Sequence, residues 1–276
     1  YQRIRSIEEG CQCLAEAAGD GAILAGGTDL LVEIRNGLKS PQLLVDCKGL
    51  ESLKALSVDD SGSTIGASVA LNQLIEHRGF RTIHPALADA LASIGTYQLR
   101  NRATLVGNIC NASPAADASP VLLVLDAVVE VVGVVGPRTI PISDFFAGVK
   151  ETTLTLDEIV TTITLPARSG LRTAFRKQQR IRGHDLAVIN VAGAYSQADK
   201  TLKLAIGSCA PTPVLLDPIE VDSKDNEAFA DHVIETLLRA VSPISDVRAS
   251  AGYRNALLPI LVRRILHELL SEGGGA

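Results

Sequence analysis

The sequence contains no methionine and no tryptophan, and aromatic residues make up only 3% of its 276 positions. It also has no uninterrupted apolar run long enough to cross a bilayer. The nearest candidate, residues 121–135, is broken by Asp126 and Glu130. We therefore expect no membrane span, and the sequence shows no signal peptide.

Cysteine is scarce and scattered. The five cysteines are odd in number and include no C-x-x-C pair, which argues against a zinc site or an iron–sulfur cluster in this chain. Reduced, buried thiols in a cytoplasmic protein are the favoured interpretation. His77 and His84 have no acid or cysteine at ligand spacing, so we expect surface histidines and no metal ligands.

An excess of basic residues is also missing. Lys and Arg number 26 and Asp and Glu number 31, which gives a formal net charge of -5 and no electrostatic reason to expect nucleic acid binding. Hydrophobic residues account for 46% and charged residues for 21% of the sequence, a composition typical of globular proteins. The length predicts a sizeable core and two or three subdomains.

One short stretch, residues 25–30 (AGGTDL), organises the N-terminal part of the chain. An apolar segment typical of a buried strand, residues 21–24, precedes it, and apolar residues at helical spacing follow, with Thr28 placed to cap the helix. Adjacent glycines allow a sharp turn and close approach to a ligand. The first amides of a helix can face an anion such as a phosphate. A phosphate site and a simple tight turn both remain open, since neither the G-x-G-x-x-G nor the P-loop spacing is present.

Around this stretch the pattern predicts a small parallel unit, with a second strand at residues 43–46. Ligands of such units lie beyond the carboxyl ends of the strands, where the glycines are. Further along we expect strands over residues 54–67, 122–135, 138–140 and 158–165, helices over 71–77 and 85–94, an antiparallel hairpin at 187–195 and 202–209, and helices over 227–239 and 250–270.

A second informative stretch, residues 100–117, is rich in small and amide side chains within an otherwise apolar chain. Such side chains suit a pocket wall with fixed polar groups, and they equally suit an ordered loop of Asx turns. A run of cations follows later in the chain, and it fits either a solvated strand face or the neighbourhood of an anionic group. The run consists of Arg172, Arg176, Lys177, Arg180 and Arg182.

Three motifs occur in a fixed order: A-G-G-T-D-L at 25–30, R-N-x-A-T-x-x-G-N and S-P-x-x-D within 100–117, and F-x-K with H-D-L-A-x-x-N-V-A within 175–192. In this combination the chain resembles, over essentially its whole length, the FAD-binding (medium) subunit of the molybdenum hydroxylases. That family includes carbon monoxide dehydrogenase and xanthine dehydrogenase. One departure is Val106, where the family usually has a glycine; valine would be strained there if the position required a positive φ.

The resemblance implies FAD as cofactor and assigns residues to it. The pyrophosphate would lie on the backbone of Leu24, Ala25, Gly26, Gly27, Thr28, Asp29 and Leu30, with a second phosphate-facing loop at Thr104, Gly107 and Asn108. Ser113 and Asp117 would bind ribityl or ribose hydroxyls, Val160 would touch the isoalloxazine ring, and Lys177 would favour the reduced, anionic flavin. No catalytic acid, base, nucleophile or metal ligand is implied.

The implied fold is α+β, with a strand–helix FAD lobe over residues 1–55, a second α/β lobe over 56–168 and a C-terminal domain of antiparallel sheet and helices over 169–276. The implied function is electron transfer from the [2Fe–2S] clusters of a small subunit, supplied by a molybdopterin large subunit, through FAD to an external acceptor. The implied assembly is a dimer of heterotrimers in the cytoplasm. Two alternatives are a self-sufficient flavoprotein reductase of the same fold, which would use the cations at 172–182, and a scaffold that has lost FAD, suggested by Val106.

Overall fold

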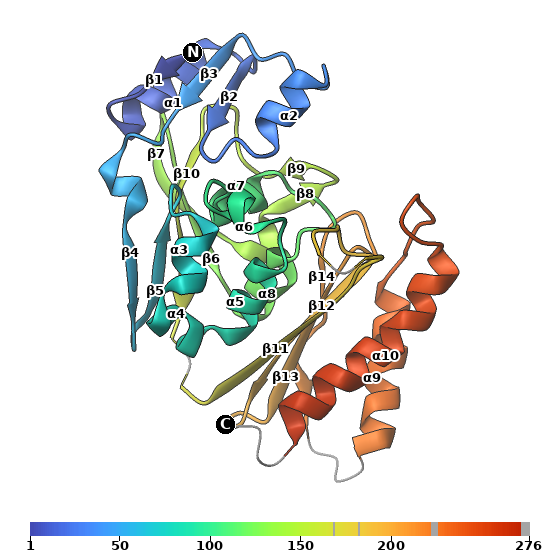
Figure 1. The fold of residues 1–276 in the computed structure, drawn as a ribbon. Coiled ribbons are helices and arrows are strands. Elements are labelled where there is room, and N and C mark those ends of the chain that lie inside the picture. The colour runs from blue at the N-terminus through green and yellow to red at the C-terminus, as the bar shows by residue number, and fades with distance from the viewer. Residues whose placement is uncertain (168, 182, 222–225, 272–276) are drawn as a thin grey trace.

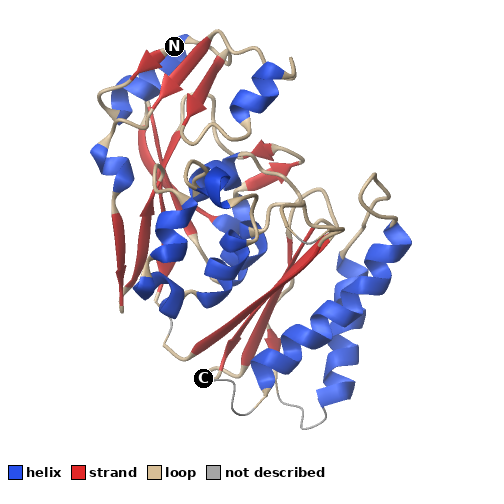
Figure 2. Cartoon of the chain, viewed as in Figure 1, coloured by secondary structure: helices blue, strands red, loops and turns tan. Residues whose placement is uncertain are grey.

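The computed structural model describes residues 1–167, 169–181, 183–221 and 226–271. Arg182, a member of the predicted cationic run, lies outside the described residues. Three parts follow one another along the chain: a small sheet with short helices, a middle part with a longer sheet and several helices, and a C-terminal sheet beside two long helices (Figures 1 and 2). This mixture of helices and largely separate sheets confirms the predicted α+β class.

The N-terminal part is a three-stranded parallel sheet in the order β1-β3-β2. The parallel pair of β2 and β3 was predicted from the strand–helix–strand pattern, and β1 was not. The predicted Thr28 cap is wrong: the second helix begins at Leu30, and no side chain caps it. Main-chain bonds close its first turn instead, with Leu31 N donating to Gly27 O at 3.1 Å, so no hydroxyl is needed. The elements are β1 (Gln2–Arg3), α1 (Ile7–Glu16), β2 (Gly21–Leu24), α2 (Leu30–Arg35) and β3 (Leu43–Asp46).

The middle part contains a five-stranded antiparallel sheet in the order β4-β5-β10-β6-β7 and a separate β8-β9 hairpin. Its strands are β4 (Leu56–Asp59), β5 (Gly62–Gly66), β6 (Val128–Gly133), β7 (Gly136–Pro141), β8 (Phe146–Gly148), β9 (Glu151–Thr152) and β10 (Ile159–Pro166). Its α-helices are α3 (Leu71–Glu76), α4 (Arg78–Ile83), α5 (Pro85–Ala92), α6 (Tyr97–Arg100), α7 (Leu105–Cys110) and α8 (Ala118–Val124). Two short 3-10 helices, Glu51–Lys54 and Ile142–Asp144, complete it.

One expectation for this part is wrong. Residues 122–124 belong to helix α8 and are not the start of a strand. Every residue of α8 is buried, so the helix has no polar face and its apolar run could not be distinguished from a strand by periodicity. Residues 100–117, for which a pocket wall and an ordered loop were both open, contain helix α7.

The expectation of a surface position for His84 is also wrong. His84 is 3% exposed and lies between α4 and α5, with its Nε2 2.9 Å from Ser63 Oγ and its ring against Phe80. Burial lowers the pKa of His84 to about 4, so the ring is neutral at pH 7. His77 is exposed as expected, and its Nδ1 accepts a hydrogen bond from Phe80 N.

The C-terminal part confirms the long antiparallel hairpin and both helices. Strands run in the order β11-β12-β13-β14, with β15 also paired to β13. Helix α10 packs on β11 and β12 from one side, while α5 and α8 of the middle part pack on the other side (Figure 1). The elements are β11 (Leu171–Gln178), β12 (Ile189–Ser196), β13 (Thr201–Gly207), β14 (Val214–Leu215), β15 (Ile219–Glu220), α9 (Asn226–Ala240) and α10 (Ala251–Leu270).

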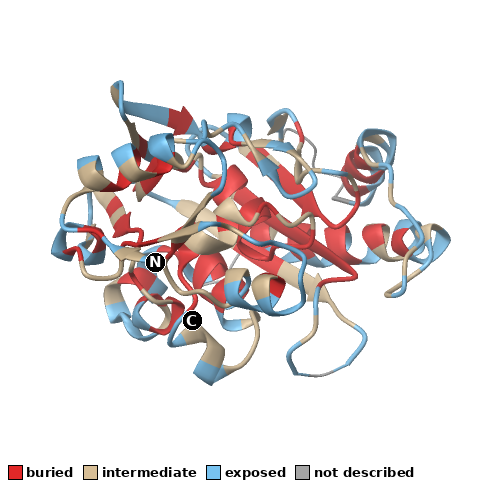
Figure 3. Cartoon of the chain, turned by 90° about the horizontal axis from the view of Figure 1, so that it is seen from above, coloured by how far each residue is buried: buried red, intermediate tan, exposed pale blue. Residues whose placement is uncertain are grey.

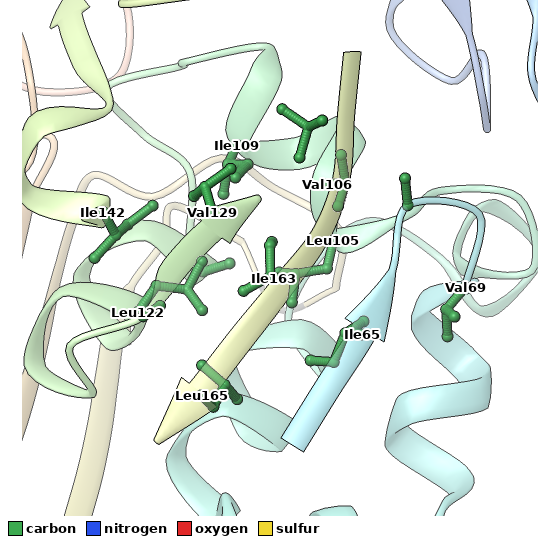
Figure 4. Close-up of a cluster of buried hydrophobic side chains, with 14 of the residues drawn as sticks. Ile65, Val69, Leu105, Val106, Ile109, Leu122, Val129, Ile142, Ile163 and Leu165 are labelled. Carbon is green, nitrogen blue, oxygen red and sulfur yellow. The ribbon is translucent and has the colours of Figure 1, made fainter. Parts of the chain in front are cut away.

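Buried side chains form one large cluster through the first two parts and a second cluster between the C-terminal sheet and its helices (Figure 3). Val106 belongs to the first cluster with its neighbours Leu105 and Ile109 on α7 and with Ile163 on β10 (Figure 4). Val106 is helical and has no positive φ. The valine is therefore accommodated without backbone strain, and it contributes apolar packing.

Candidate cofactor-binding site

A cavity of about 760 Å³ is lined by residues from all three parts of the chain. This volume is within the range of small-molecule and cofactor pockets. Of the fourteen residues assigned from the sequence, all described by the structure, only Leu24 does not line the cavity; it is buried, and its carbonyl accepts from Cys47 N at 3.3 Å. The lining includes Ala25, Gly26, Gly27, Thr28, Asp29, Leu30, Thr104, Gly107, Asn108, Ser113, Asp117, Val160 and Lys177.

The glycine turn is pressed against the segment that leads into helix α7. A Cβ placed on Gly26 would lie 2.2 Å from Arg102 O and 3.0 Å from Ala103 Cα, so only glycine allows this approach. Gly27 has a φ of +73°, a conformation that favours glycine. The two glycines thus bring two distant segments of the sequence together at one wall of the cavity.

Helix α7 begins at the same wall. Thr104 caps it by accepting a hydrogen bond from Gly107 N at 3.0 Å. A Cβ on Gly107 would meet only Thr104 Oγ1 within 4 Å, at 3.0 Å. The side-chain oxygen of Asn108 is buried and has no protein partner. A buried amide oxygen without a partner fits a wall shaped for a polar ligand.

A buried ion pair also lines the cavity. Lys177 Nζ lies 2.7 Å from Asp117 Oδ2, and both side chains are only 6% exposed. Lys177 also donates to Ser93 O at 3.1 Å, and Asn190 Nδ2 donates to Asp117 Oδ1 at 2.9 Å. Burial raises the pKa of the Asp117 carboxyl, while Lys177 and Asn190 oppose this shift. The sequence assigned Asp117 and Lys177 separately; the structure joins them and adds Asn190.

Ser113 and Val160 also line the cavity. Ser113 Oγ accepts from Ala115 N at 3.3 Å, which holds the 113–117 segment in a tight turn. Val160 is on β10 where the pairing with β6 shifts register between Val160 and Thr162. An irregularity of this kind bends a strand and redirects its side chains, and Val160 contributes to the cavity wall while remaining 3% exposed.

A polar cluster near the glycine turn was not anticipated. Glu33 of α2 binds Lys39 at 2.9 Å and also binds Lys150, which follows β8 and donates to Asn111 Oδ1 at 3.3 Å. These four residues line the cavity and connect the first part of the chain to the second. Burial raises the pKa of nearby Asp29. The sequence gave no signal for the cluster, because its members are far apart in the chain and only the fold brings them together.

The cationic run divides between two surfaces. Arg172 donates to the carbonyls of Glu268 and Ser271, and Arg176 binds the Glu268 carboxylate, so both face α10. Arg180 holds Asp185 through two hydrogen bonds of 2.9 and 3.0 Å. Of the described residues of this run, only Lys177 lines the cavity.

Two family models together match most of the chain. The model described as the FAD binding domain in molybdopterin dehydrogenase matches residues 1–168. The chain belongs to this family. A second model, the CO dehydrogenase flavoprotein C-terminal domain, matches residues 173–269. The family suggested by the three sequence motifs is therefore confirmed, and with it FAD as the cofactor of the family's defining domain.

Individual relatives match over almost their full lengths. The chain is 30% identical to the xanthine dehydrogenase FAD-binding subunit of Escherichia coli O157:H7, covering 100% of this chain and 97% of that one. It is 28% identical to the carbon monoxide dehydrogenase medium chain of Hydrogenophaga pseudoflava, covering 97% and 95%. A solved structure of carbon monoxide dehydrogenase from Hydrogenophaga pseudoflava matches with a TM-score of 0.92 at 27% identity, covering 98% and 96%. The predicted fold is confirmed by this match.

The described residues include no group of three or more His, Cys, Asp or Glu side chains arranged to hold a metal ion. None of their helices combines the length and the apolar character that crossing a membrane requires.

Proposed function

We propose that this chain is the electron-transferring FAD subunit of a multi-subunit molybdenum hydroxylase. The observation that carries the proposal is one cavity in which the Gly26 turn, the start of α7 and the Lys177–Asp117 pair all meet. Their separate sequence motifs are those of the family, and both family models match this chain.

Each wall of the cavity has a proposed task. The backbone of residues 25–30 and the residues Thr104, Gly107 and Asn108 hold the pyrophosphate. Ser113 and Asp117 bind hydroxyls of the ribityl or ribose groups. When bound, FAD supplies the redox chemistry, and the protein supplies position, charge and shielding.

The other residues act on the ring system. Val160 provides an apolar contact for the isoalloxazine ring, and Lys177 provides a positive charge that favours its reduced form. The Asp117 carboxylate and Ser93 O fix the Lys177 ammonium in one place. A cation held in this way needs little reorganisation when charge develops beside it.

The proposed partners follow from the relatives, which are a FAD-binding subunit and a medium chain of larger enzymes. We infer an iron–sulfur small subunit as electron donor and a molybdopterin large subunit that oxidises the substrate, in a cytoplasmic dimer of heterotrimers. The final acceptor is external to this chain. Within the chain, we propose functional units at residues 1–55, 56–168 and 169–276.

The structure gives little support to a self-sufficient reductase. Such an enzyme would need substrate-binding cations beside the flavin, and Arg172 and Arg176 are directed to α10. Arg180 is held by Asp185. Among the described residues of the cationic run, Lys177 alone lines the cavity, and we assign it to the flavin and not to a substrate.

Purification of the tagged chain from its native cells tests the proposal. We expect a yellow complex with one FAD per copy of this chain, together with an iron–sulfur chain and a molybdenum-containing chain. Rapid mixing with the complex's substrate should reduce the FAD only when the iron–sulfur chain is present. Direct reduction of FAD in the isolated chain by a small organic substrate would instead support a self-sufficient enzyme, and a colourless chain that does not bind added FAD would support a scaffold.

A further inference from the structure

The largest fully buried side chain of the described residues is a charged one outside the cavity lining. Arg254, on α10, is 1% exposed. Its Nη2 lies 2.7 Å from Asp246 Oδ1, and its Nη1 donates to Ser208 O at 2.5 Å. Its Nε is buried without a partner.

Ser208, which follows β13, connects this pair to the cavity. It is 5% exposed and has a φ of +65°, a backbone conformation that serine rarely adopts. Its backbone N–H donates to Pro114 O at 2.7 Å, and its hydroxyl donates to Ala187 O at 3.3 Å. Residues on both sides of Pro114, and the three residues before Ala187, line the cavity. One residue therefore ties together two segments of the cavity wall.

Asp246 is held from a second direction as well. Arg248 binds its Oδ2 through Nη2 at 2.5 Å and Nε at 2.9 Å, and Arg248 Nη1 lies 3.4 Å from Ala187 O. The contacts thus run from α10 and the 246–248 loop, through Ser208, to the 113–117 and 184–187 segments.

Stability alone is a poor explanation for this arrangement. Removing a guanidinium from water is costly, and well-packed apolar side chains often replace buried ion pairs without loss of stability. The unpartnered Nε adds to the cost. The strained φ of Ser208 must also be stabilised by its surroundings, and strain of this kind is frequent beside functional sites.

We propose that Arg254 and Asp246 are positioning residues for the FAD site and act through Ser208. By holding the Ser208 carbonyl, Arg254 keeps the serine in its left-handed conformation, so that its N–H and hydroxyl fix the carbonyls of Pro114 and Ala187. Ser113 and Asp117 are thereby held in a fixed position relative to residues 184–186, which also line the cavity. This inference rests on the proposed function, which places FAD between these segments.

The test uses the full 276-residue chain and added FAD. Arg254→Met should fold, yet bind FAD about 10-fold more weakly, the loss of roughly one hydrogen bond to a charged group. The visible circular dichroism of the bound flavin should change and its reduction potential should shift. Arg254→Lys, which keeps the charge facing Asp246, should restore part of the affinity. Arg263→Met removes an exposed ion pair with Asp231 and serves as the control on the same helix, with wild-type behaviour expected.

Two outcomes would overturn the inference. The first is an Arg254→Met chain that melts at a lower temperature but retains wild-type FAD affinity, flavin dichroism and potential, because Arg254 would then be purely structural. The second uses Ser208→Gly, which serves if Arg254→Met does not fold. Glycine tolerates the positive φ and keeps the N–H, but it lacks the hydroxyl that bonds Ala187 O. Wild-type flavin dichroism and affinity in Ser208→Gly would contradict the proposal. A wild-type chain that binds no FAD would instead refute the proposed function on which the inference rests.

Discussion

At the scale of single residues, the Lys177–Asp117 ion pair is a buried pair of opposite charges in the cavity lining. Both are 6% exposed, and their charged atoms are 2.7 Å apart at the cavity wall. Since breaking a buried pair leaves an uncompensated charge, we expect substitutions here to lower stability. Arg176, the neighbour of Lys177 on β11, faces α10 and offers a natural control.

Replacing Lys177 should lower the reduction potential of bound FAD. In Lys177→Gln the positive charge near the flavin is lost, and we expect the potential to fall by about 30 mV, equivalent to roughly 1.4 kcal/mol for a two-electron couple. Potentiometric titration of the FAD-loaded chain measures this. Arg176→Gln should leave the potential unchanged. An equal potential in wild type and Lys177→Gln would remove Lys177 from the flavin environment.

His84 should make stability depend on pH. Its pKa falls from 6.5 in the unfolded chain to about 4 in the folded chain because the ring is buried. The unfolded chain therefore binds a proton more readily between these values, and stability that is fully present above pH 6.5 is lost as the pH falls towards 4. The expected loss is about 3 kcal/mol.

The measurement for His84 is urea unfolding at pH 7 and pH 4.5 for wild type and His84→Gln. The glutamine can still bond Ser63 but does not titrate. Other groups titrate equally in both chains, so the difference between them isolates His84. Parallel pH profiles for the two chains would contradict the prediction.

At the scale of single elements, helix α7 and the glycine turn before α2 depend on each other. The turn can approach the backbone at Arg102 and Ala103 only because Gly26 has no side chain. The helix is capped by Thr104, leaving Gly107 beside the cavity. The two glycines therefore have different roles: Gly26 allows two backbone segments to meet, and Gly107 leaves space for a ligand.

This difference predicts two distinct phenotypes. Gly107→Ala should change the melting temperature only slightly, because alanine is a better helix former but its Cβ would lie 3.0 Å from Thr104 Oγ1, while FAD binding should weaken. Gly26→Ala should lower the melting temperature and abolish FAD binding, since its Cβ would lie 2.2 Å from Arg102 O. Thermal unfolding and FAD fluorescence quenching measure both.

The control for the glycine variants is Gly252→Ala in α10, where no neighbouring atom lies within 4 Å of the added carbon. It should leave FAD binding unchanged. Undiminished FAD affinity in Gly107→Ala would show that the space beside Gly107 is not used by the cofactor.

At the scale of the whole molecule, the cavity is formed by all three parts of the chain together. The first part supplies the glycine turn, the middle part supplies α7, Asp117 and Val160, and the C-terminal part supplies Lys177. A ligand that contacts all three parts stabilises the folded chain as a unit, because it binds the native state and not the unfolded one.

FAD should therefore raise the melting temperature. At a free concentration 100 times its dissociation constant, FAD should add about 2.7 kcal/mol of stability. ADP carries the pyrophosphate but no flavin, so at the same multiple of its own dissociation constant it should stabilise equally, and Lys177→Gln should weaken FAD without affecting ADP. Calorimetry with each ligand tests this, and equal weakening of both ligands by Lys177→Gln would contradict the proposed position of Lys177 beside the flavin.

Local sequence was sufficient for most elements near the site. The strand of residues 21–24, the parallel unit around it and the hairpin of β12 and β13 were all predicted, because their apolar patterns and turn residues are local signals. Helix α8 was missed because a helix buried on every side has no periodicity. His84 was misplaced because its burial depends on β5, which is distant in sequence.

The sequence by itself determined the family, the α+β class and several of the segments that line the cavity, since ordered motifs and side-chain types are written directly in the chain. Only the tertiary structure decided how those residues interact. The pairing of Lys177 with Asp117, the contact of Gly26 with Arg102 and the link from Arg254 through Ser208 all join distant segments. Such contacts depend on how sheets and helices pack together, and no local pattern of residues specifies them.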